Sequence, residues 1–214
     1  MREQLTDIRS TRNPKARIKI MEGHFATVNS HINTYIDMST VKCRHNNGRE
    51  TARVLAEHFR NNTMVDTIVC LDGTEVIGTF MADFLSDRGI MSINSGNNIS
   101  IITPDVNAYG QLVFMDSTIR MIKNMQVLVL AASVTTGRTI AQAAEAVSYY
   151  GGTVGGVAAI FSNVEQTPEE MEIFSIFHKE DLPDYQAYQP SECPMCRRKQ
   201  PLDAIVNGFG YSKL

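Results

Sequence analysis

The sequence predicts an α/β fold in which the strands of a largely parallel sheet alternate with helices. Val127–Ala132 is an unbroken apolar run of strand length, as expected for a strand that is covered on both faces. A helical pattern follows over Arg138–Tyr150, and a second apolar run, Val154–Phe161, follows the helix. This strand–helix–strand order is typical of parallel sheets with right-handed crossovers.

The composition is that of a globular protein with one main domain. Of the 214 residues, 43% are hydrophobic and 20% are charged, which excludes a disordered chain. The net charge of −3 provides no basic field for nucleic acid. The longest apolar run, Val127–Ala132, is far shorter than the roughly 20 residues of a membrane span, and the polar start predicts no secretory signal. Four cysteines favour a reducing, cytoplasmic setting over a disulfide scaffold.

The first half of the chain has weaker patterns. The first 20 residues are charged and interrupted by Pro14, which leaves a mobile arm and a short helix as alternatives. Residues 21–41 mix apolar and polar residues and predict short strands and turns. Gly48–Arg60 has apolar residues at helical spacing and precedes Asn61 and Asn62, which end the predicted helix.

The middle of the chain continues the alternation. Thr67–Leu71 is predicted to be a buried strand, and Thr74 to begin the helix Glu75–Arg88. Four prolines follow Leu182, so we expect a main domain over residues 1–182 and a tail over 183–214 that packs on it. Further strands are predicted at Ile90–Ile93, Ile99–Thr103, Gln111–Met115 and Ile173–Phe177.

The loop after Val127–Ala132 is the first candidate binding site, because ligands of open α/β sheets bind at the carboxyl ends of strands. It combines hydroxyl residues, a glycine and an arginine at a helix N-terminus, where backbone N–H groups and the helix dipole favour a phosphate. The alternative is a turn that only joins strand to helix. The candidate phosphate-binding residues are Ser133, Val134, Thr135, Thr136, Gly137, Arg138 and Thr139.

At this loop the sequence resembles a known family. The segment Val127–Thr139, VLVLAASVTTGRT, is similar to the phosphoribosyl pyrophosphate signature of type I phosphoribosyltransferases. That signature begins with four apolar residues and two acids. An apolar residue, any residue and Thr-Thr-Gly-x-Ser/Thr follow. SHINTYID, at Ser30–Asp37, resembles the amino-terminal segment of the orotate branch. Asp66–Gly78 lies where that family has its pyrophosphate-binding loop, and the resemblance covers residues 25–162 in order.

The resemblance implies a type I phosphoribosyltransferase-like parallel sheet of five strands, flanked by helices, with a small hood and here a Cys-containing tail. Such proteins transfer ribose 5-phosphate to a nitrogenous base, with Mg²⁺ on the pyrophosphate, and the resemblance also implies a homodimer. It places Thr135–Thr139 at the 5-phosphate, and His31 and Tyr35 near the base. The residues that it places at the pyrophosphate and Mg²⁺ are Asp72, Gly73, Thr74 and Glu75.

Taken from the residues alone, Asp72 and Glu75 also fit structural roles, as a turn residue and as a dipole partner of its helix. Two further features depart from the family. Ala131 and Ala132 replace the acidic pair, at a cost of about 3–6 kcal/mol if two charge-assisted hydrogen bonds to ribose are lost. Residues 89–119 contain no basic residue to stabilise the leaving pyrophosphate. Two functions therefore stay open: a phosphoribosyltransferase that uses a phosphoribosyl or nucleotide ligand, and a non-catalytic sensor of such ligands.

The tail contains half of a zinc-binding pattern, Cys193-Pro-Met-Cys196. A structural zinc site needs four ligands. Cys43 and His45 are the other close pair of ligand types, so the sequence predicts a zinc site of these four residues that joins tail to hood. Two free thiols and a redox pair are the alternatives. The remaining histidines, among them His24, are interpreted as isolated surface or hydrogen-bonded side chains.

Overall fold

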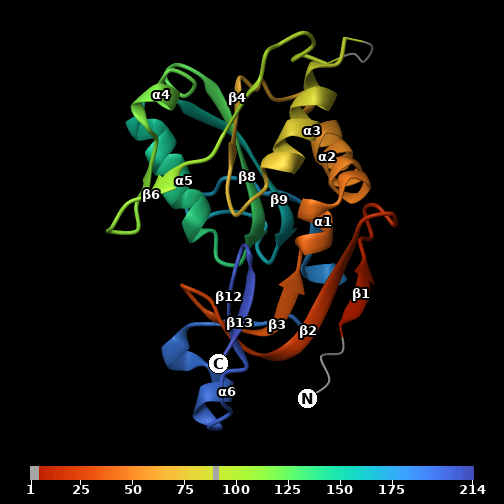
Figure 1. The fold of residues 1–214 in the computed structure, drawn as a ribbon, viewed down its shortest axis with the longest axis vertical. Helices are drawn as coiled ribbons and strands as arrows, with labels where there is room; N and C mark the ends of the chain where they lie inside the picture. Colours follow the sequence, from red (N-terminus) through yellow and green to blue (C-terminus); the bar gives the residue numbers. More distant parts are fainter. Residues whose placement is uncertain (1–4, 89–91) are drawn as a thin grey trace.

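The computed structural model describes residues 5–88 and 92–214 and divides them between a central sheet and a hood sheet (Figure 1). The five strands of the central sheet are all parallel, in the order β10-β9-β8-β4-β5. This confirms the predicted fold class. The bounds of its strands are β4, Thr67–Cys70; β5, Ser100–Ile102; β8, Gln126–Val134; β9, Thr153–Ser162; and β10, Phe174–His178.

Helices cover both faces of this sheet, which explains why β8 is apolar without interruption over Val127–Ala132. Leu128 and Leu130 face the core with α2 (His45–Phe59) and α3 (Glu75–Ser86). Val127 and Val129 face the other core, with α5 (Arg138–Tyr149). Successive side chains of a strand alternate between faces, so a strand buried on both sides needs apolar residues at every position.

Two predicted strands differ from the structure. Gln111–Met115 contributes only β7 (Leu112–Val113), which pairs with β6 (Asp105–Val106) in a separate hairpin. In Ile90–Ile93, residues 90 and 91 lie outside the described residues, and Ser92 and Ile93 are not in a strand. Apolar runs this short do not by themselves distinguish a sheet strand from a hairpin or a turn.

The hood is a mixed sheet built from both ends of the chain. Its main order is β11-β3-β2-β12-β13, and β1 pairs with β2. From Leu5 onward, where the description begins, the first segment forms strand β1 and, from Arg17, enters strand β2, so for the described residues neither the mobile arm nor the short helix is correct. The tail supplies three strands of the same sheet. The bounds are β1, Thr6–Arg9; β2, Arg17–Ala26; β3, His31–Asp37; β11, Ala187–Tyr188; β12, Ala204–Asn207; and β13, Gly210–Lys213.

Short helices complete the description. No helix among the described residues is long and apolar enough to cross a membrane. The short elements are α1, Ser39–Cys43; α4, Asp116–Ile119; α6, Pro194–Arg197; and the 3₁₀ turns Lys179–Asp181 and Pro190–Glu192.

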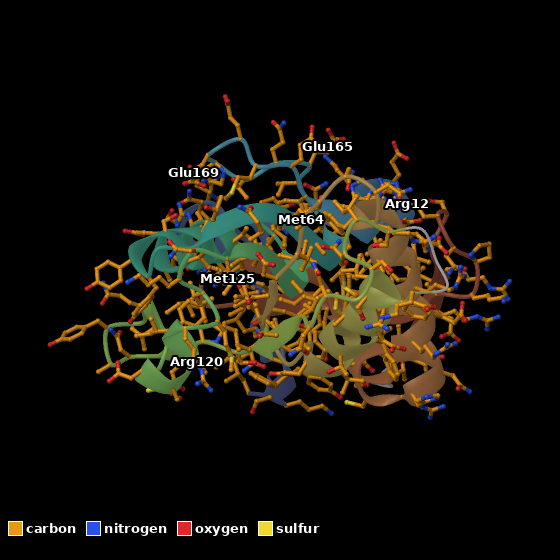
Figure 2. All side chains as sticks on the ribbon, turned by 90° about the horizontal axis from the view of Figure 1, so that it is seen from above. Arg12, Met64, Arg120, Met125, Glu165 and Glu169 are labelled. Carbon is orange, nitrogen blue, oxygen red and sulfur yellow. The ribbon has the colours of Figure 1, made fainter. Side chains whose placement is uncertain are left out.

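The two ends of the central sheet face different parts of the molecule. The carboxyl ends of its strands point toward the hood (Figure 1). Figure 2 views the molecule from the opposite end, where Met64 and Met125 immediately precede β4 and β8. Arg120 also lies at this end, in the connection that enters β8. Its charge is therefore far from the hood side of the sheet.

Two neighbouring glycines of β9 provide a test of this packing. A Cβ atom at Gly156 would lie 2.9 Å from the Phe59 ring and 3.0 Å from a Leu128 methyl, whereas at Gly155 the nearest atom would be 3.4 Å away. We expect Gly156→Ala to lower the free energy of unfolding by about 1–3 kcal/mol through overpacking. Gly155→Ala is the matched control and should be neutral or slightly stabilising. Denaturant unfolding measures both, and equal effects would contradict this packing.

Candidate functional site

A cavity of about 180 Å³ lies between the carboxyl ends of the central strands and the hood. Three segments form most of its wall: the β8–α5 loop, the β2–β3 loop and the turn between β12 and β13. The lining residues from the β8–α5 loop are Ser133, Val134, Thr135, Thr136, Gly137, Arg138 and Thr139, which is the whole predicted phosphate-binding set.

The backbone at Gly137 shapes this loop. Gly137 has φ 79° and is the residue before α5, so the chain enters the helix from the left-handed region that favours glycine. A Cβ atom there would also lie 3.1 Å from both Thr167 and Pro168. Glycine is therefore required at position 137 both by the left-handed backbone conformation and by the close packing of Thr167 and Pro168.

The first turn of α5 leaves hydrogen-bond donors free. No side chain caps the helix, and its first backbone bond runs from the Ala141 N–H to the Gly137 carbonyl oxygen at 2.9 Å. Among the described residues, the backbone N–H groups of residues 138–140 have no partner. The partial positive charge of a helix N-terminus adds to these free donors. The loop thus offers an anion-binding surface to the cavity.

A tail residue closes one side of the loop. Thr135 Oγ1 and the Tyr185 hydroxyl lie 3.4 Å apart, and Tyr185 is buried and lines the cavity. Burial raises the pKa of Tyr185, and its hydrogen bond to Thr135 opposes the shift. The Tyr185 hydroxyl therefore remains a neutral hydrogen-bond partner beside the loop.

The predicted pyrophosphate loop is only partly directed at the cavity. Asp72 and Gly73 both have positive φ, 56° and 75°, and Asp72 lines the cavity. The Thr74 hydroxyl instead donates to the carbonyl oxygens of Leu71 and Leu130, at 2.9 and 3.2 Å. Thr74 therefore joins β4 to β8 and is not available as a ligand.

Glu75 has a local partner as well. Its Oε1 accepts a hydrogen bond of 2.9 Å from the Thr103 hydroxyl at an exposed position. Of the four residues that the resemblance placed at the metal, Asp72 is thus the carboxylate that lines the cavity. Mg²⁺ is commonly held by one or two carboxylates together with substrate phosphates and waters, so this single side chain fits such an ion on a bound pyrophosphate.

Lys42, which the sequence patterns did not single out, lies beside Asp72. It is only 7% exposed, and its ammonium donates to the carbonyl oxygens of Asp72, at 2.8 Å, and of Gly208. Burial lowers the pKa of Lys42, opposed mainly by the nearby Asp72 charge. Burial likewise raises the pKa of the Asp72 carboxyl, opposed by Lys42. Each group is the other's principal charge partner in a dry corner of the site.

The turn between β12 and β13 covers this corner. A Cβ atom at Gly208 would lie 2.3 Å from Asp72 Cβ, so only glycine allows this approach. The Phe209 ring lies against Gly73, and its centroid is 5.5 Å from Lys42 Nζ. The end of the tail therefore forms part of the cavity wall.

The two residues predicted near the base lie in different places. Tyr35 lines the cavity and packs edge-on against Tyr211, with ring centroids 5.1 Å apart. Burial, with smaller effects of Asp37 and Tyr211, raises the pKa of Tyr35 to about 12, so its hydroxyl is a hydrogen-bond donor. His31 does not line the cavity, and its ring lies against His24.

Ala131 and Ala132 lie at the carboxyl end of β8 on opposite faces. Ala131 lines the main cavity, and Ala132 lines a smaller hollow next to Lys42 and Phe209. The positions that carry acids in the family signature therefore face the hollows where that signature's ligand would bind.

The predicted zinc set needs a correction. Cys193 and Cys196 lie beside His24 and His31, and the four ligand atoms are within 4.8 Å of one another. Cys43 and His45 are not in this group. The His45 ring instead packs edge-on against Phe80, with centroids 5.4 Å apart. Strand pairing between β2 and β3 brings the two histidines together, and nothing in their sequence spacing indicates it.

The chain is similar in sequence and in fold to known phosphoribosyltransferases. No family model matches the chain. The orotate phosphoribosyltransferase of Chlorobaculum parvum is 26% identical over 198 residues, covering 86% of this chain and 88% of that protein. Orotate phosphoribosyltransferase of Mycobacterium tuberculosis in complex with 5-phospho-alpha-D-ribosyl 1-diphosphate (PRPP) has a TM-score of 0.51 and 19% identity, covering 69% of this chain and 82% of that chain.

UMP synthase of Leishmania donovani has a TM-score of 0.56 and 17% identity, over 77% of this chain and 34% of that chain. The present chain thus spans about a third of that protein. Together these similarities confirm the resemblance: the chain has the type I phosphoribosyltransferase fold and is similar in sequence to orotate phosphoribosyltransferases.

The buried Asp72 carboxyl predicts a pH dependence of stability. Burial raises the folded-state pKa of Asp72 above its ordinary value of 3.8, so the folded protein holds more protons than the unfolded chain just above that pH. The Asp72 contribution to stability is therefore lost as pH rises through the folded-state pKa. Asp72→Asn keeps the shape, tolerates positive φ and cannot ionise. We expect its stability relative to the wild type to increase between about pH 4 and pH 7 in denaturant unfolding. Parallel pH profiles would contradict the assignment.

Proposed function

We propose that the protein is a phosphoribosyltransferase that binds PRPP in the cavity under the hood and transfers its phosphoribosyl group to a nitrogenous base. One observation carries the proposal: the complete β8–α5 loop, with unpaired N–H groups behind Gly137, opens into a cavity. The similarity to orotate phosphoribosyltransferases makes orotate the first base to test. The other elements of the site fit the two ends of such a substrate.

The loop is suited to the 5-phosphate. The N–H groups of residues 138–140 and the hydroxyls of Thr135, Thr136 and Thr139 supply donors, and Arg138 adds a full positive charge. These groups are held on a rigid strand–helix junction, so they bind the phosphate without reorganisation. Their contribution is to anchor the ribose at one end and fix its orientation.

The Asp72 corner is suited to the pyrophosphate. Lys42 supplies positive charge that the region 89–119 lacks, close to the carboxyl end of β4. Mg²⁺ bound with the pyrophosphate would neutralise part of its charge, with Asp72 as the protein ligand. In the transfer, the C1–O bond to pyrophosphate breaks with its electron pair leaving on the pyrophosphate, a base nitrogen forms the new C1–N bond, and the proton of that nitrogen passes to the departing pyrophosphate or to solvent. Positive charge at the leaving group stabilises this step.

The base is assigned to the hood side of the cavity. Tyr35 and the β2–β3 loop, residues 27–30, lie across from the β8–α5 loop. The Tyr35 hydroxyl supplies a donor, and the surrounding apolar wall includes Ile32 and Ile36. We further propose a cytoplasmic homodimer, in line with the family resemblance and the free cysteines. Sedimentation of the purified chain tests the dimer.

The decisive measurement is release of pyrophosphate from PRPP with Mg²⁺ and a panel of bases that includes orotate. We expect release that depends on the base. Binding of a nucleoside 5′-monophosphate without any release would instead identify a non-catalytic sensor on this fold. The replacement of the acidic pair by Ala131 and Ala132 makes this distinction important.

Two arginines provide a matched test of the phosphate loop. Arg138 lines the cavity, whereas Arg120 lies at the opposite end of the sheet (Figure 2). We expect Arg138→Gln to weaken binding of uridine 5′-monophosphate about tenfold, since one charge-assisted hydrogen bond is lost. Arg120→Gln should leave affinity unchanged. Calorimetric titration of both variants measures this, and equal affinities would place the phosphate elsewhere.

A further inference from the structure

A cluster of four ligand-type side chains joins the hood strands to the tail. His24 lies in β2 and His31 begins β3. Cys193 immediately precedes α6, and Cys196 lies within it. His24 is 1% exposed and Cys193 is 0% exposed. The two segments are far apart in the sequence, because His24 and Cys193 are separated by 169 residues. None of the four residues lines the main cavity, so the cluster is separate from the proposed active site.

Four of the six distances between the ligand atoms are close to the edges of a tetrahedral zinc site, and all six are at most 4.8 Å. With Zn–S of about 2.3 Å and Zn–N of about 2.0 Å, the edges of a regular tetrahedron are about 3.5 Å for nitrogen to sulfur and about 3.3 Å for nitrogen to nitrogen. His24 Nε2 lies 3.5 Å from Cys193 Sγ and 3.6 Å from Cys196 Sγ. His31 Nδ1 lies 3.2 Å from Cys196 Sγ and 3.1 Å from His24 Nε2.

The surroundings of His24 hold its ring in the orientation of a ligand. Its Nδ1 lies 3.0 Å from the Gln200 carbonyl oxygen, which accepts a hydrogen bond from Nδ1–H and leaves Nε2 free to coordinate. Metal-bound histidines are commonly oriented in this way by a carbonyl or carboxylate.

A backbone irregularity directs this side chain. The β2–β3 register shifts between Glu22 and Phe25, so His24 lies in a β-bulge, which re-aims side chains. A Cβ atom at Gly23 would lie 2.7 Å from the Phe25 ring and 2.8 Å from Asp203 Oδ2. The glycine before His24 is therefore needed for the bulge to pack.

We propose that His24, His31, Cys193 and Cys196 bind one zinc ion, which fixes the tail to the hood. Two sulfur and two nitrogen ligands in a tetrahedron suit Zn²⁺, whereas Mg²⁺ prefers oxygen ligands. Four protein ligands complete the coordination, so the site is structural rather than catalytic. The ion joins β2 and β3 to a chain segment that local secondary structure holds only weakly.

The zinc site leads directly to the wall of the cavity. Between the cluster and β12, Asp203 accepts a hydrogen bond from the His24 N–H through Oδ2 and donates its own N–H to the His24 carbonyl, each at 2.8 Å. Ala204 then pairs with Phe25, and β12 continues to the turn at Gly208 that covers Asp72. The ion therefore holds β12, the strand that positions this turn. This structural effect does not depend on the proposed function, whereas any effect of the ion on transferase activity rests on it.

The first test measures metal in the full-length protein. We expect one equivalent of zinc per chain by mass spectrometry of the metal content after purification with zinc in the medium. After removal of zinc by a chelator, Co²⁺ should give the strong visible bands of a tetrahedral site and a thiolate-to-cobalt band in the near ultraviolet. Absence of zinc together with absence of these bands, or a Cys193–Cys196 disulfide in the purified protein, would overturn the proposal.

Variants identify the ligands. Cys196 is exposed, so Cys196→Ser should fold and yet lose most of the bound zinc. His31→Ala should do the same, and in both variants the Co²⁺ bands should weaken. Cys43→Ser, at the other exposed cysteine, is the matched control and should keep one equivalent. Loss of zinc from the Cys43 variant, or retention in both other variants, would contradict this ligand set.

Hydrogen exchange tests whether the zinc ion holds the tail strands in place, and it does not require transferase activity. Chelation should speed hydrogen exchange of backbone amides in β12 and β13 and leave β8 and β9 protected, because only the hood strands depend on the ion. Unchanged exchange in β12 and β13 would show that the ion does not hold the tail. Zinc binding with no transferase activity would leave this inference intact and overturn the proposed function alone.

Discussion

The left-handed backbone at Gly137 is the constraint on which the candidate site depends. It allows the chain to leave β8 and enter α5 through Gly137, an N-cap residue that has no side chain to cap the helix. The N–H groups of the first turn therefore point toward the hood without an internal partner among the described residues. The first N–H groups of any helix lack an intrahelical partner. Here the three residues that carry them line a cavity, where a ligand could accept their hydrogen bonds.

The hood turns this exposed helix end into one wall of a cavity that stays open to solvent on one side. Without the hood, the carboxyl ends of the strands would face open solvent, and the charges there would be screened. The β2–β3 loop and the turn at Gly208 line the same cavity as the β8–α5 loop. The turn at Gly208 also covers Asp72 and accepts a hydrogen bond from the buried Lys42 ammonium. Electrostatic interactions are stronger there, at the expense of folded-state stability, and such charged groups are frequent at functional sites.

Much of the fold follows from local sequence patterns. The unbroken apolar run of β8, the helical spacing in α2 and α5, and the Thr-Thr-Gly loop are each encoded within a few residues, and the structure agrees with each within a few residues at the ends. The sequence predicted the hood only as short strands and turns, because its long strands mix apolar and polar residues and pair with segments from both ends of the chain. A strand such as β2 acquires its partners from β1, β3 and β12, which no local pattern can indicate.

The sequence by itself determined the fold class, the position of the Thr-Thr-Gly loop between strand and helix, and the close pair Cys193 and Cys196, since periodicity, glycine and residue spacing act over short distances. Only the tertiary structure decided that Lys42 reaches Gly208, 166 residues away, and that His24 rather than Cys43 lies beside the tail cysteines. These contacts arise from strand pairing and closure of the hood. The physical reason is that charge pairing and metal coordination depend on distance in space, which the order of residues does not specify.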